Sequence, residues 1–322
     1  MVYLWVDGSD PVWRAKRARA QAQLETRSAH LAAFANVEGR YRDNGELRFN
    51  LRALERFFPD HGHVYLVTDG QQPKWLRPSS KLTVVDHKTL LPPSSTVFDS
   101  ANIETWLHHI PGLSERFIYL NDDTFFGAPL DAARWFGQPM RVFTESAPAT
   151  GHGELQPLAL APVNASILSR QWLTAKFLGY VHQPHVYTHA PRSMLKSAMF
   201  ELEALAPELF QQSRATSFRT WSAPALIPDL VPRWMVHMGL AVEEPLNPLH
   251  LSTGDADATA QFAALTQSFG TLPFFCINDT CDDAAGDDAR LKLVMEVLER
   301  LLPEASAFER GDVSQGQRAA TC

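Results

Sequence analysis

Short apolar runs alternate with helix-like segments through the first 120 residues. Four of these runs have the length and composition of buried strands and occupy residues 2–6, 64–67, 82–85 and 117–120. Segments with helical character lie between them, at residues 12–35, 47–58 and 102–110. Apolar strands that alternate with helices are typical of an α/β protein whose sheet is covered on both faces.

The second half of the chain has a weaker pattern. Residues 127–164 contain several prolines and glycines, which predicts connecting structure. A helix is expected at residues 192–205, beginning beside His189-Ala190-Pro191, and a short helix within residues 253–270. A strand at 274–277 and a strong helix at 288–302 follow, and the polar residues 311–322 are expected to fray.

Acidic residues follow each of the four early strands. The residues concerned are Asp7, Asp10, Asp69, Asp86, Asp122 and Asp123. Ligands of open α/β sheets bind at the carboxyl ends of the strands, so these loops concentrate negative charge where a ligand is expected. Asp and Gly also end strands simply as turn formers, which is the simpler interpretation of Asp69 and Asp86. The tandem pair Asp122-Asp123 instead favours a bound divalent cation, because adjacent carboxylates repel each other.

Composition excludes several classes of protein. The chain has 322 residues, 45% of them hydrophobic and 20% charged, which indicates a globular protein of one large or two small domains. Its 29 basic and 36 acidic residues give a net charge of −7, which disfavours a general nucleic-acid binder. Three cysteines cannot form a disulfide framework, and neither a membrane-spanning run nor a signal peptide is visible. We therefore expect a cytoplasmic protein.

Cations and a base are also present for chemistry on phosphates. Transfer of a phosphoryl group needs positive charge around the phosphate oxygens and a base for the incoming hydroxyl. The candidates are Arg42, Arg48, His189, Arg192 and Arg219. A single histidine or arginine is more often structural or exposed than catalytic. The segment CINDTC lacks the second ligand pair of a zinc motif, and its first cysteine, Cys276, is expected in the core.

Four segments, in order, resemble the four blocks of the Stealth family. The first is VYLWVDGSDPVW. The second extends from RYRDNGELRFNLRALERFFPDHGHVYLVTDGQQPKWL to IETWLHHIPGLSERFIYLNDDTFFG. HAPRSMLKS resembles the start of the third block, and FFCINDTCDD resembles the fourth. The segment after Arg219 departs from the family, because Ala223-Pro224 occupies a place where relatives have a polar segment with Asp or Asn.

The resemblance implies an activity and a fold. It implies transfer of a hexose-1-phosphate from a nucleotide-diphosphate sugar to an acceptor sugar hydroxyl, forming a phosphodiester in bacterial capsule or exopolysaccharide synthesis. It implies a Rossmann-like, glycosyltransferase-A-like sheet, mostly parallel, completed by a more helical C-terminal part. The expected cofactor is Mg²⁺ or Mn²⁺. The expected division is residues 1–150 for the nucleotide-sugar and metal core, 151–310 for the acceptor side, and 311–322 for a tail.

The resemblance also assigns roles to single residues. His189 is the expected base, Arg219 is expected to stabilise the transferring phosphate, and Asp10 is expected to act in catalysis beside the donor. The expected metal ligands are Asp122, Asp123 and Asp279. The expected substrate-binding residues are Asp7, Asp43, Asn44, Arg48, Asn102, Glu104 and Arg192.

Two other functions remain open. A metal-dependent glycosyltransferase would also place an acidic pair beside a nucleotide sugar, but it would form a glycosidic bond and release a nucleoside diphosphate. A regulator that binds sugar nucleotides without catalysis would not need a base such as His189. The expected partners are a nucleotide-diphosphate sugar and a glycan acceptor, with no nucleic acid. Peripheral association with polysaccharide-synthesis machinery at the inner membrane face is also expected.

Overall fold

A five-stranded sheet forms the centre of the molecule, with strand order β3-β2-β1-β4-β7. The computed structural model describes residues 1–25, 31–32, 35–93, 95–147, 153–157, 161–285 and 287–310. Four strands run parallel: β1 (Val2–Leu4), β2 (Val64–Thr68), β3 (Leu82–Asp86) and β4 (Arg116–Asn121). They correspond to the four predicted strands and confirm the α/β fold class. The edge strand β7 (Arg192–Leu195) pairs antiparallel with β4.

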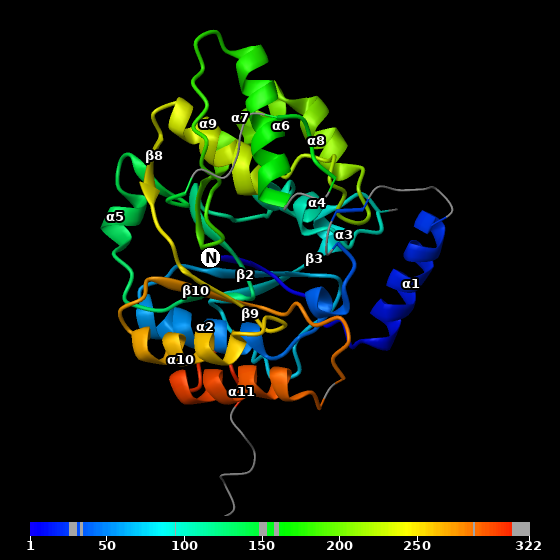
Figure 1. Ribbon diagram of the computed structural model, residues 1–322, viewed down its shortest axis with the longest axis vertical. Helices are drawn as coiled ribbons and strands as arrows, with labels where there is room; N and C mark the ends of the chain where they lie inside the picture. The colour runs from blue at the N-terminus through cyan, green and yellow to red at the C-terminus, as the bar shows by residue number, and fades with distance from the viewer. Residues whose placement is uncertain are drawn as a thin grey trace, which may run out of the picture.

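One face of this sheet is covered by helices from both ends of the chain. These helices are α2 (Glu46–Phe57), α10 (Ala258–Ser268) and α11 (Ala289–Leu301). Leu47, Leu51 and Leu54 lie on the apolar side of α2 and share one core cluster with Tyr3 and Leu66 of the sheet. Figure 1 shows α2 between the sheet and α11, so the end of the chain closes a layer begun near its start.

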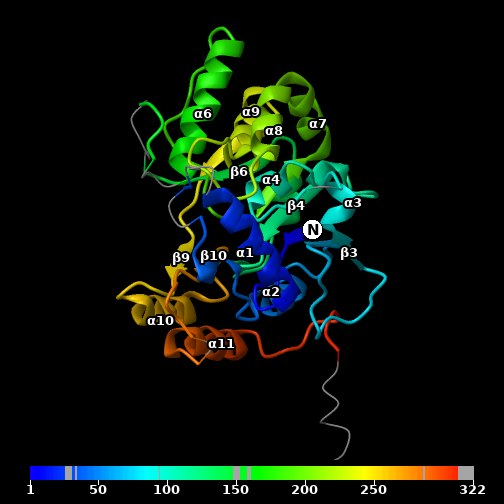
Figure 2. The same cartoon turned by 90° about the vertical axis from the view of Figure 1, so that its right-hand side faces the viewer.

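The opposite face is covered by a group of mostly short helices (Figure 2). They are α3 (His87–Leu90), α4 (Ser100–Glu104), η2 (Leu107–His109), α6 (Ala161–Lys176), α7 (Lys196–Leu205), α8 (Pro207–Arg214), the π-helical turn η3 (Leu226–Leu230) and α9 (Val231–His237). Their buried residues form a second core cluster with Val2 and Val67. The sheet is therefore buried on both sides, as its continuous apolar strands predict.

Two smaller sheets lie beside the central one. In the first, β10 (Phe274–Asn278) lies between β5 (Thr124–Phe126) and β9 (Leu249–Ser252) and runs antiparallel to β5. In the second, β6 (Met140–Thr144) pairs in parallel with β8 (Ala241–Pro245). Because β5 follows β4 after two residues, β10 is brought directly to the end of the central sheet.

Several sequence-based expectations need correction. Residues 127–164 are not only connecting structure, because they contain α5 (Ala132–Phe136), β6 and the start of α6. The helix expected at 192–205 begins with four residues of strand β7, since these residues extend the ladder of β4. The helix expected at 102–110 is divided between α4 and η2.

The helix expected at 12–35 is described as α1 (Pro11–Glu25), and its predicted far end is wrong, because Leu31 pairs with Thr220 in an isolated bridge and Ala32 donates to the carbonyl of Arg219. Residues 26–30 and 33–34 lie outside the described part of the chain, as does the tail 311–322. The strand expected at 274–277 and the helices expected within 253–270 and at 288–302 are confirmed as β10, α10 and α11. The division at residue 150 stays a prediction. Within the described residues, none of the helices combines the length and apolar character needed to cross a membrane.

Candidate active site

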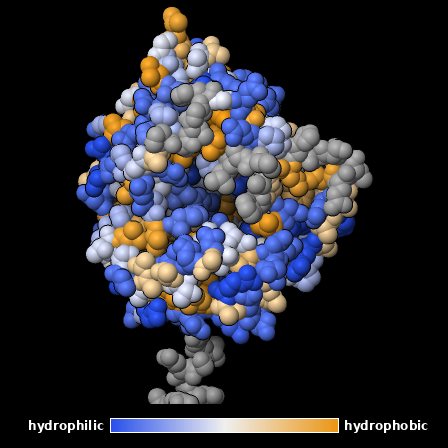
Figure 3. All heavy atoms as spheres, in the orientation of Figure 1, coloured by the Kyte–Doolittle hydropathy of each residue, from blue (hydrophilic) through white to orange (hydrophobic). Residues whose placement is uncertain are grey.

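A cavity of about 1050 Å³ opens at the carboxyl ends of β1 and β4. The order of the strands reverses between these two, which is where open α/β sheets bind ligands. Figure 3, drawn in the orientation of Figure 1, shows a recess near the middle of the molecular surface. Eight of the predicted site residues line the cavity: Arg42, Glu104, Asp122, Asp123, His189, Arg192, Arg219 and Asp279.

The turn between β4 and β5 presents the acidic pair. Asp122 and Asp123 are its two residues, and both are half-buried. Asn50, a fully buried residue of α2, donates to the backbone carbonyls of Asp122 at 3.0 Å and Thr124 at 2.6 Å. An amide from the helix beneath the sheet therefore fixes the backbone that carries both carboxylates.

Asp123 is surrounded by hydrogen-bonding groups. Its carboxylate lies 3.1 Å from Thr124 Oγ1, 3.4 Å from His189 Nε2 and 3.5 Å from Cys276 Sγ. Burial acts to raise the pKa of Asp123, but His189 and these hydrogen bonds outweigh burial and hold the pKa below its ordinary value. Asp123 is therefore ionised at neutral pH. His189 lies in the loop before β7, not at the start of a helix as the sequence predicted.

Asp122 has the opposite environment. Burial raises its pKa well above the ordinary value, and the neighbouring carboxyls of Asp123, Glu46 and Asp43 raise it further. Burial also raises the pKa of Glu46 to about 8. Carboxyl groups held together in this way are stabilised by a divalent cation, and carboxylate oxygens are the ligands that Mg²⁺ prefers. The residues present therefore fit the expected metal.

Basic side chains also line the cavity. Arg219 donates to Ser100 Oγ at 3.0 Å, and Arg40 donates to the same oxygen at 3.2 Å. Arg192, on β7, contacts the carbonyl of Pro228 at 3.4 Å. Burial lowers the pKa of Arg192 and of Arg219, but arginine remains charged in proteins. These guanidinium groups provide positive charge for an anionic ligand.

Glu104 also borders the cavity but is 4% exposed. Its Oε1 accepts a hydrogen bond of 2.8 Å from the hydroxyl of Tyr119, and its Oε2 has no partner among the described residues. Burial raises the pKa of Glu104. A buried carboxyl group with a raised pKa and one oxygen without a partner is suited to hold or pass a proton. The predicted role of Glu104 in substrate binding stays a prediction.

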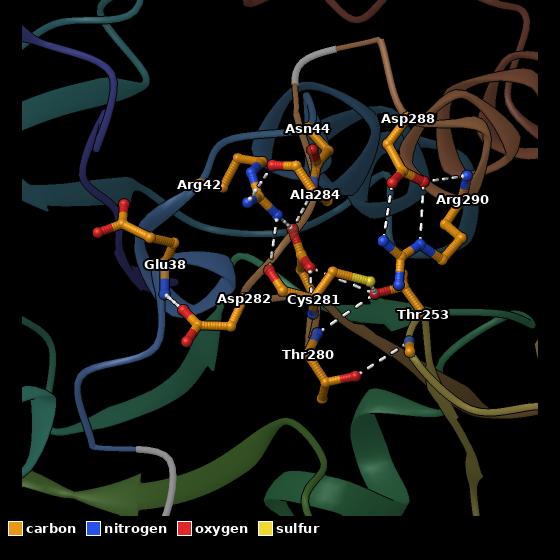
Figure 4. Close-up of polar contacts among 12 residues, drawn as sticks. Glu38, Arg42, Asn44, Thr253, Thr280, Cys281, Asp282, Ala284, Asp288 and Arg290 are labelled. Atoms are coloured by element: carbon orange, nitrogen blue, oxygen red, sulfur yellow. Dashed lines mark hydrogen bonds and ion pairs between the residues drawn. The ribbon is translucent and has the colours of Figure 1, made fainter.

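Asp279 is engaged in an ion pair. Its Oδ2 accepts from Arg42 at 2.5 Å and from Asn44 at 3.1 Å, and its Oδ1 accepts from the backbone of Cys281 at 2.9 Å. Figure 4 shows Arg42 extending to Ala284 from the segment before α2. Through these contacts Asp279 ties the start of the 279–284 loop to Arg42 and Asn44. Its predicted role as a metal ligand stays a prediction.

The other six predicted residues are not among those that line the cavity, and their side chains have local partners. Asp10 caps α1, accepting from the backbone of Val12 and Trp13 at 2.8 and 2.9 Å. Asn102 donates to two backbone carbonyls of the 214–216 segment. The remaining four contacts are Asp7 with Ser9, Asp43 with Gly45, Asn44 with Glu46 and Arg48 with Glu309. Their expected roles in donor binding stay predictions.

Sequence reasoning missed five residues at or beside the site: Arg40, Glu46, Asp99, His250 and Cys276. A local signal exists for Asp99, which caps α4 and stands just before a helix-forming segment. Arg40 and Glu46 lie within the second Stealth-like segment. The position of Cys276 has no local signal, because it depends on the pairing of β10 with β5.

The fold and the cavity define an α/β protein with a cavity lined by charged residues at the switch point of its sheet. Sequence comparison then identifies the family. Stealth protein conserved region 1 matches residues 1–25, region 2 matches residues 40–142 and region 4 matches residues 272–319. These regions together span more than half of the chain, and the chain belongs to the Stealth family. Our assignment of a third block stays a prediction.

Curated relatives are named exopolysaccharide phosphotransferases. One from Streptomyces coelicolor is 34% identical over 96% of this chain and 52% of its own length. CpsY from Mycobacterium tuberculosis is 32% identical over 98% of this chain and 59% of its own length. The chain therefore spans between half and three fifths of the length of these two relatives.

The solved structures that resemble this chain have much lower sequence identity than these relatives. A galactosyltransferase, LgtC, in complex with donor and acceptor sugar analogues has a TM-score of 0.41 and 9% identity, over 94% of this chain and 96% of that one. Mouse xyloside xylosyltransferase 1 has a TM-score of 0.37 and 11% identity, over 88% of this chain and 98% of that one. The assignment of the α/β fold rests on the sheet topology above and not on these structures.

Proposed function

We propose that this protein transfers a hexose-1-phosphate from a nucleotide-diphosphate sugar to a hydroxyl of an acceptor sugar. The observation that carries the proposal is the arrangement of one cavity, in which the Asp122-Asp123 pair, His189 and the guanidinium groups of Arg192 and Arg219 face a common space. An acidic cluster suits a metal-bound diphosphate, and guanidinium groups suit the oxygens of the transferring phosphate.

Asp122 and Asp123 would hold Mg²⁺ or Mn²⁺. When bound, the ion would neutralise charge on the diphosphate and on the departing nucleotide. Asp122 contributes a carboxyl group whose raised pKa reflects burial and neighbouring acids, which is the environment that a cation relieves. Arg192 and Arg219 supply positive charge that is part of the protein itself.

His189 is the proposed base. Its Nε2 lies 3.4 Å from Asp123 Oδ1 and 3.2 Å from Thr124 Oγ1, so two groups orient the ring. The acceptor hydroxyl attacks the phosphorus attached to the sugar, and its proton passes to the imidazole. The bond from that phosphorus to the oxygen bridging the diphosphate breaks, and a nucleoside monophosphate leaves with the bridging oxygen.

The released nucleotide tests this proposal. The full chain is incubated with a panel of nucleotide-diphosphate sugars, Mg²⁺ and glycan acceptors, and the nucleotide product is identified by chromatography. We expect a nucleoside monophosphate, formed together with a phosphodiester. A nucleoside diphosphate would overturn the proposal in favour of the glycosyltransferase alternative. Binding of the donor without turnover of any sugar would favour the regulator.

Asp122→Asn should lower turnover by orders of magnitude in the same assay, because it removes one carboxylate from the proposed metal site. EDTA should have the same effect on the unmodified protein. Glu55 of α2, a half-buried residue whose carboxylate accepts from the backbone of Ala307 and which does not line the cavity, provides the control, and Glu55→Gln should be fully active. Full activity of the unmodified protein in EDTA would refute the role of a metal.

The names of the relatives supply the broader context. We propose that the acceptor is a growing exopolysaccharide or capsular glycan, and that the protein associates peripherally with the machinery that makes it.

A further inference from the structure

A set of three different ligand atoms lies at the base of the cavity. His189 Nε2, a carboxylate oxygen of Asp123 and Cys276 Sγ all lie within 4.8 Å of one another. Nitrogen, oxygen and sulfur ligands together are typical of Zn²⁺ and other transition metals, whereas Mg²⁺ takes oxygen ligands. These residues come from the loop before β7, the β4–β5 turn and β10, so only the folded chain assembles them.

The pairing of β10 with β5 explains how a core cysteine reaches this place. Cys276 lies directly opposite Thr124 in the antiparallel ladder. Its side chain is fully buried behind Asp123, whose carboxylate borders the cavity. An ion that enters the cavity therefore meets His189 and Asp123 first, with the thiol beneath them.

The spacing of the atoms is close to that around a tetrahedral ion. With bonds of about 2.0 Å to nitrogen and oxygen and about 2.3 Å to sulfur, tetrahedral geometry separates N and O by about 3.3 Å and S and O by about 3.5 Å. His189 Nε2 lies 3.4 Å from Asp123 Oδ1, and Cys276 Sγ lies 3.5 Å from the other oxygen, Oδ2. One atom from each residue lies within 4.8 Å of the other two, so a small turn of the carboxylate brings a single oxygen to the spacing of a shared ion. The His189 side chain is 38% exposed and has room to turn toward the thiol.

A second histidine stands nearby. The ring of His250 lies 6.0 Å from the ring of His189, centroid to centroid, and His250 also lines the cavity. Three protein ligands with a fourth position for His250 or water are sufficient for Zn²⁺.

We propose that Asp123, His189 and Cys276 form a binding site for Zn²⁺, and that occupation of this site inhibits the enzyme. The binding part of the proposal stands on the three ligands alone. The inhibitory part rests on the function proposed above, because Zn²⁺ bound to Asp123 and to His189 Nε2 would replace the contact that orients the proposed base and would lower the basicity of its ring. Zn²⁺ also occupies the carboxylate of Asp123 that the catalytic cation would use.

A second group of possible ligands, His108, His109 and Glu203, does not offer a comparable site. The two imidazoles already hydrogen-bond Glu203 Oε2 at 2.6 and 2.9 Å, and Arg214 occupies Oε1. These N–O separations are those of hydrogen bonds and are shorter than the spacing between ligands of one tetrahedral ion. The cluster is therefore complete without a metal.

Titration with Co²⁺ tests the binding site directly. Co²⁺ reports four-coordinate geometry by intense visible absorption and reports a thiolate ligand by a charge-transfer band in the near ultraviolet. The full chain should show both signals at one equivalent of Co²⁺, and Zn²⁺ should displace them. Cys276→Ser should lose the charge-transfer band and bind Co²⁺ at least about tenfold more weakly. Cys281, a buried cysteine in the loop that follows β10, provides the control, and Cys281→Ser should retain both signals.

His189→Ala keeps the test decisive if replacement of the buried cysteine disturbs folding, because His189 is partly exposed. It should also weaken Co²⁺ binding by at least about tenfold. Absence of the charge-transfer band in the unmodified chain, its retention in Cys276→Ser, or its loss in Cys281→Ser would overturn the site.

Inhibition is measured separately, as loss of turnover when Zn²⁺ is added at saturating Mg²⁺. We expect Cys276→Ser to need about tenfold more Zn²⁺ for half-inhibition than the unmodified chain. Equal sensitivity of the two proteins would overturn the inhibitory role. Failure of the proposed activity would remove only this measurement, since the cobalt spectra require no substrate.

Discussion

Glu46 provides a direct test of the acidic cluster through protein stability. Its side chain is 4% exposed at the start of α2, where its carboxyl accepts hydrogen bonds of 2.6 and 2.9 Å from Asn44. Burial, followed by the charge of Asp43, raises its pKa from 4.5 to about 8, against the opposing effect of those hydrogen bonds. Glu46→Gln keeps the shape of the side chain and removes its titration.

The magnitude follows from the linkage between proton binding and folding. The pKa is higher in the folded protein, so this group stabilises the fold fully below pH 4.5 and loses its contribution as the pH rises through about 8. A rise of about 3.5 pKa units at about 1.4 kcal/mol per unit corresponds to about 5 kcal/mol over the whole interval. Glu46→Gln should therefore be about as stable as the unmodified protein at acid pH and several kcal/mol more stable above about pH 8.

Urea unfolding at a series of pH values, without divalent ions, measures this difference. Glu55→Gln, on the same helix but outside the acidic cluster, is the control: Glu55 accepts from the backbone of Ala307, which the amide oxygen of Gln can also do, so any stability difference should not grow as the pH rises. Added Mg²⁺ should stabilise the unmodified protein most at high pH, where the cluster is ionised. If the stability difference between Glu46→Gln and the unmodified protein did not grow with pH, the reasoning about the acidic cluster would be wrong.

Three further predictions concern single side chains. His189→Ala should lower turnover by about 10²–10⁴-fold with nearly unchanged donor affinity, whereas His185→Ala, whose residue contacts Arg233 only through its carbonyl, should retain activity in the same steady-state assay. Asp10→Ala should cost about 1 kcal/mol in urea unfolding through loss of the α1 cap, and Asp10→Asn should restore that stability; an unchanged KM for the donor in both would refute its predicted role in donor binding. Glu309→Gln should destabilise by about 3 kcal/mol in thermal unfolding, since it leaves Arg48 and Arg52 without a carboxylate, and an unaltered Tm would contradict this.

The central sheet was predictable because its strands are buried on both faces. Each of β1, β2 and β4 is a run of apolar residues that ends in a polar turn, and this pattern is visible without knowledge of distant contacts. The helices α2 and α11 were equally clear, because each has an apolar side that faces one core.

Edge and half-exposed strands were missed for a physical reason. β8, with the sequence AVEEP, has mostly half-buried residues and two glutamates, so no apolar run marks it. β7 passes into α7 without an intervening turn residue, and its four residues are compatible with the helix that follows. Its strand conformation is determined by pairing with β4, about 75 residues earlier in the chain.

The candidate site could also be predicted only in part, for the same reason. The acidic pair could be predicted because it directly follows an apolar strand, and the position of a strand end is a local property. Cys276 was correctly expected in the core, but its contact with Asp123 depends on the β5–β10 register. Asp10 was expected at the donor because it also follows a strand, yet its carboxylate caps the next helix, as Asp often does.

Asp122 and Asp123 show why neighbours in sequence need not share a role. The pKa of Asp123 is held below its ordinary value, despite burial, by His189, Thr124 and Cys276, so its negative charge persists without any cation. The pKa of Asp122 is raised by burial and by surrounding carboxyls, so its negative charge is favourable only when a cation is present. If a metal binds as proposed, it should release a proton mainly from the Asp122 side of the pair, while Asp123 remains the fixed charge beside His189. Opposite pKa shifts in adjacent groups are typical of sites that divide acid–base work between two residues, and here the division follows from which of the two carboxylates has hydrogen-bond donors around it.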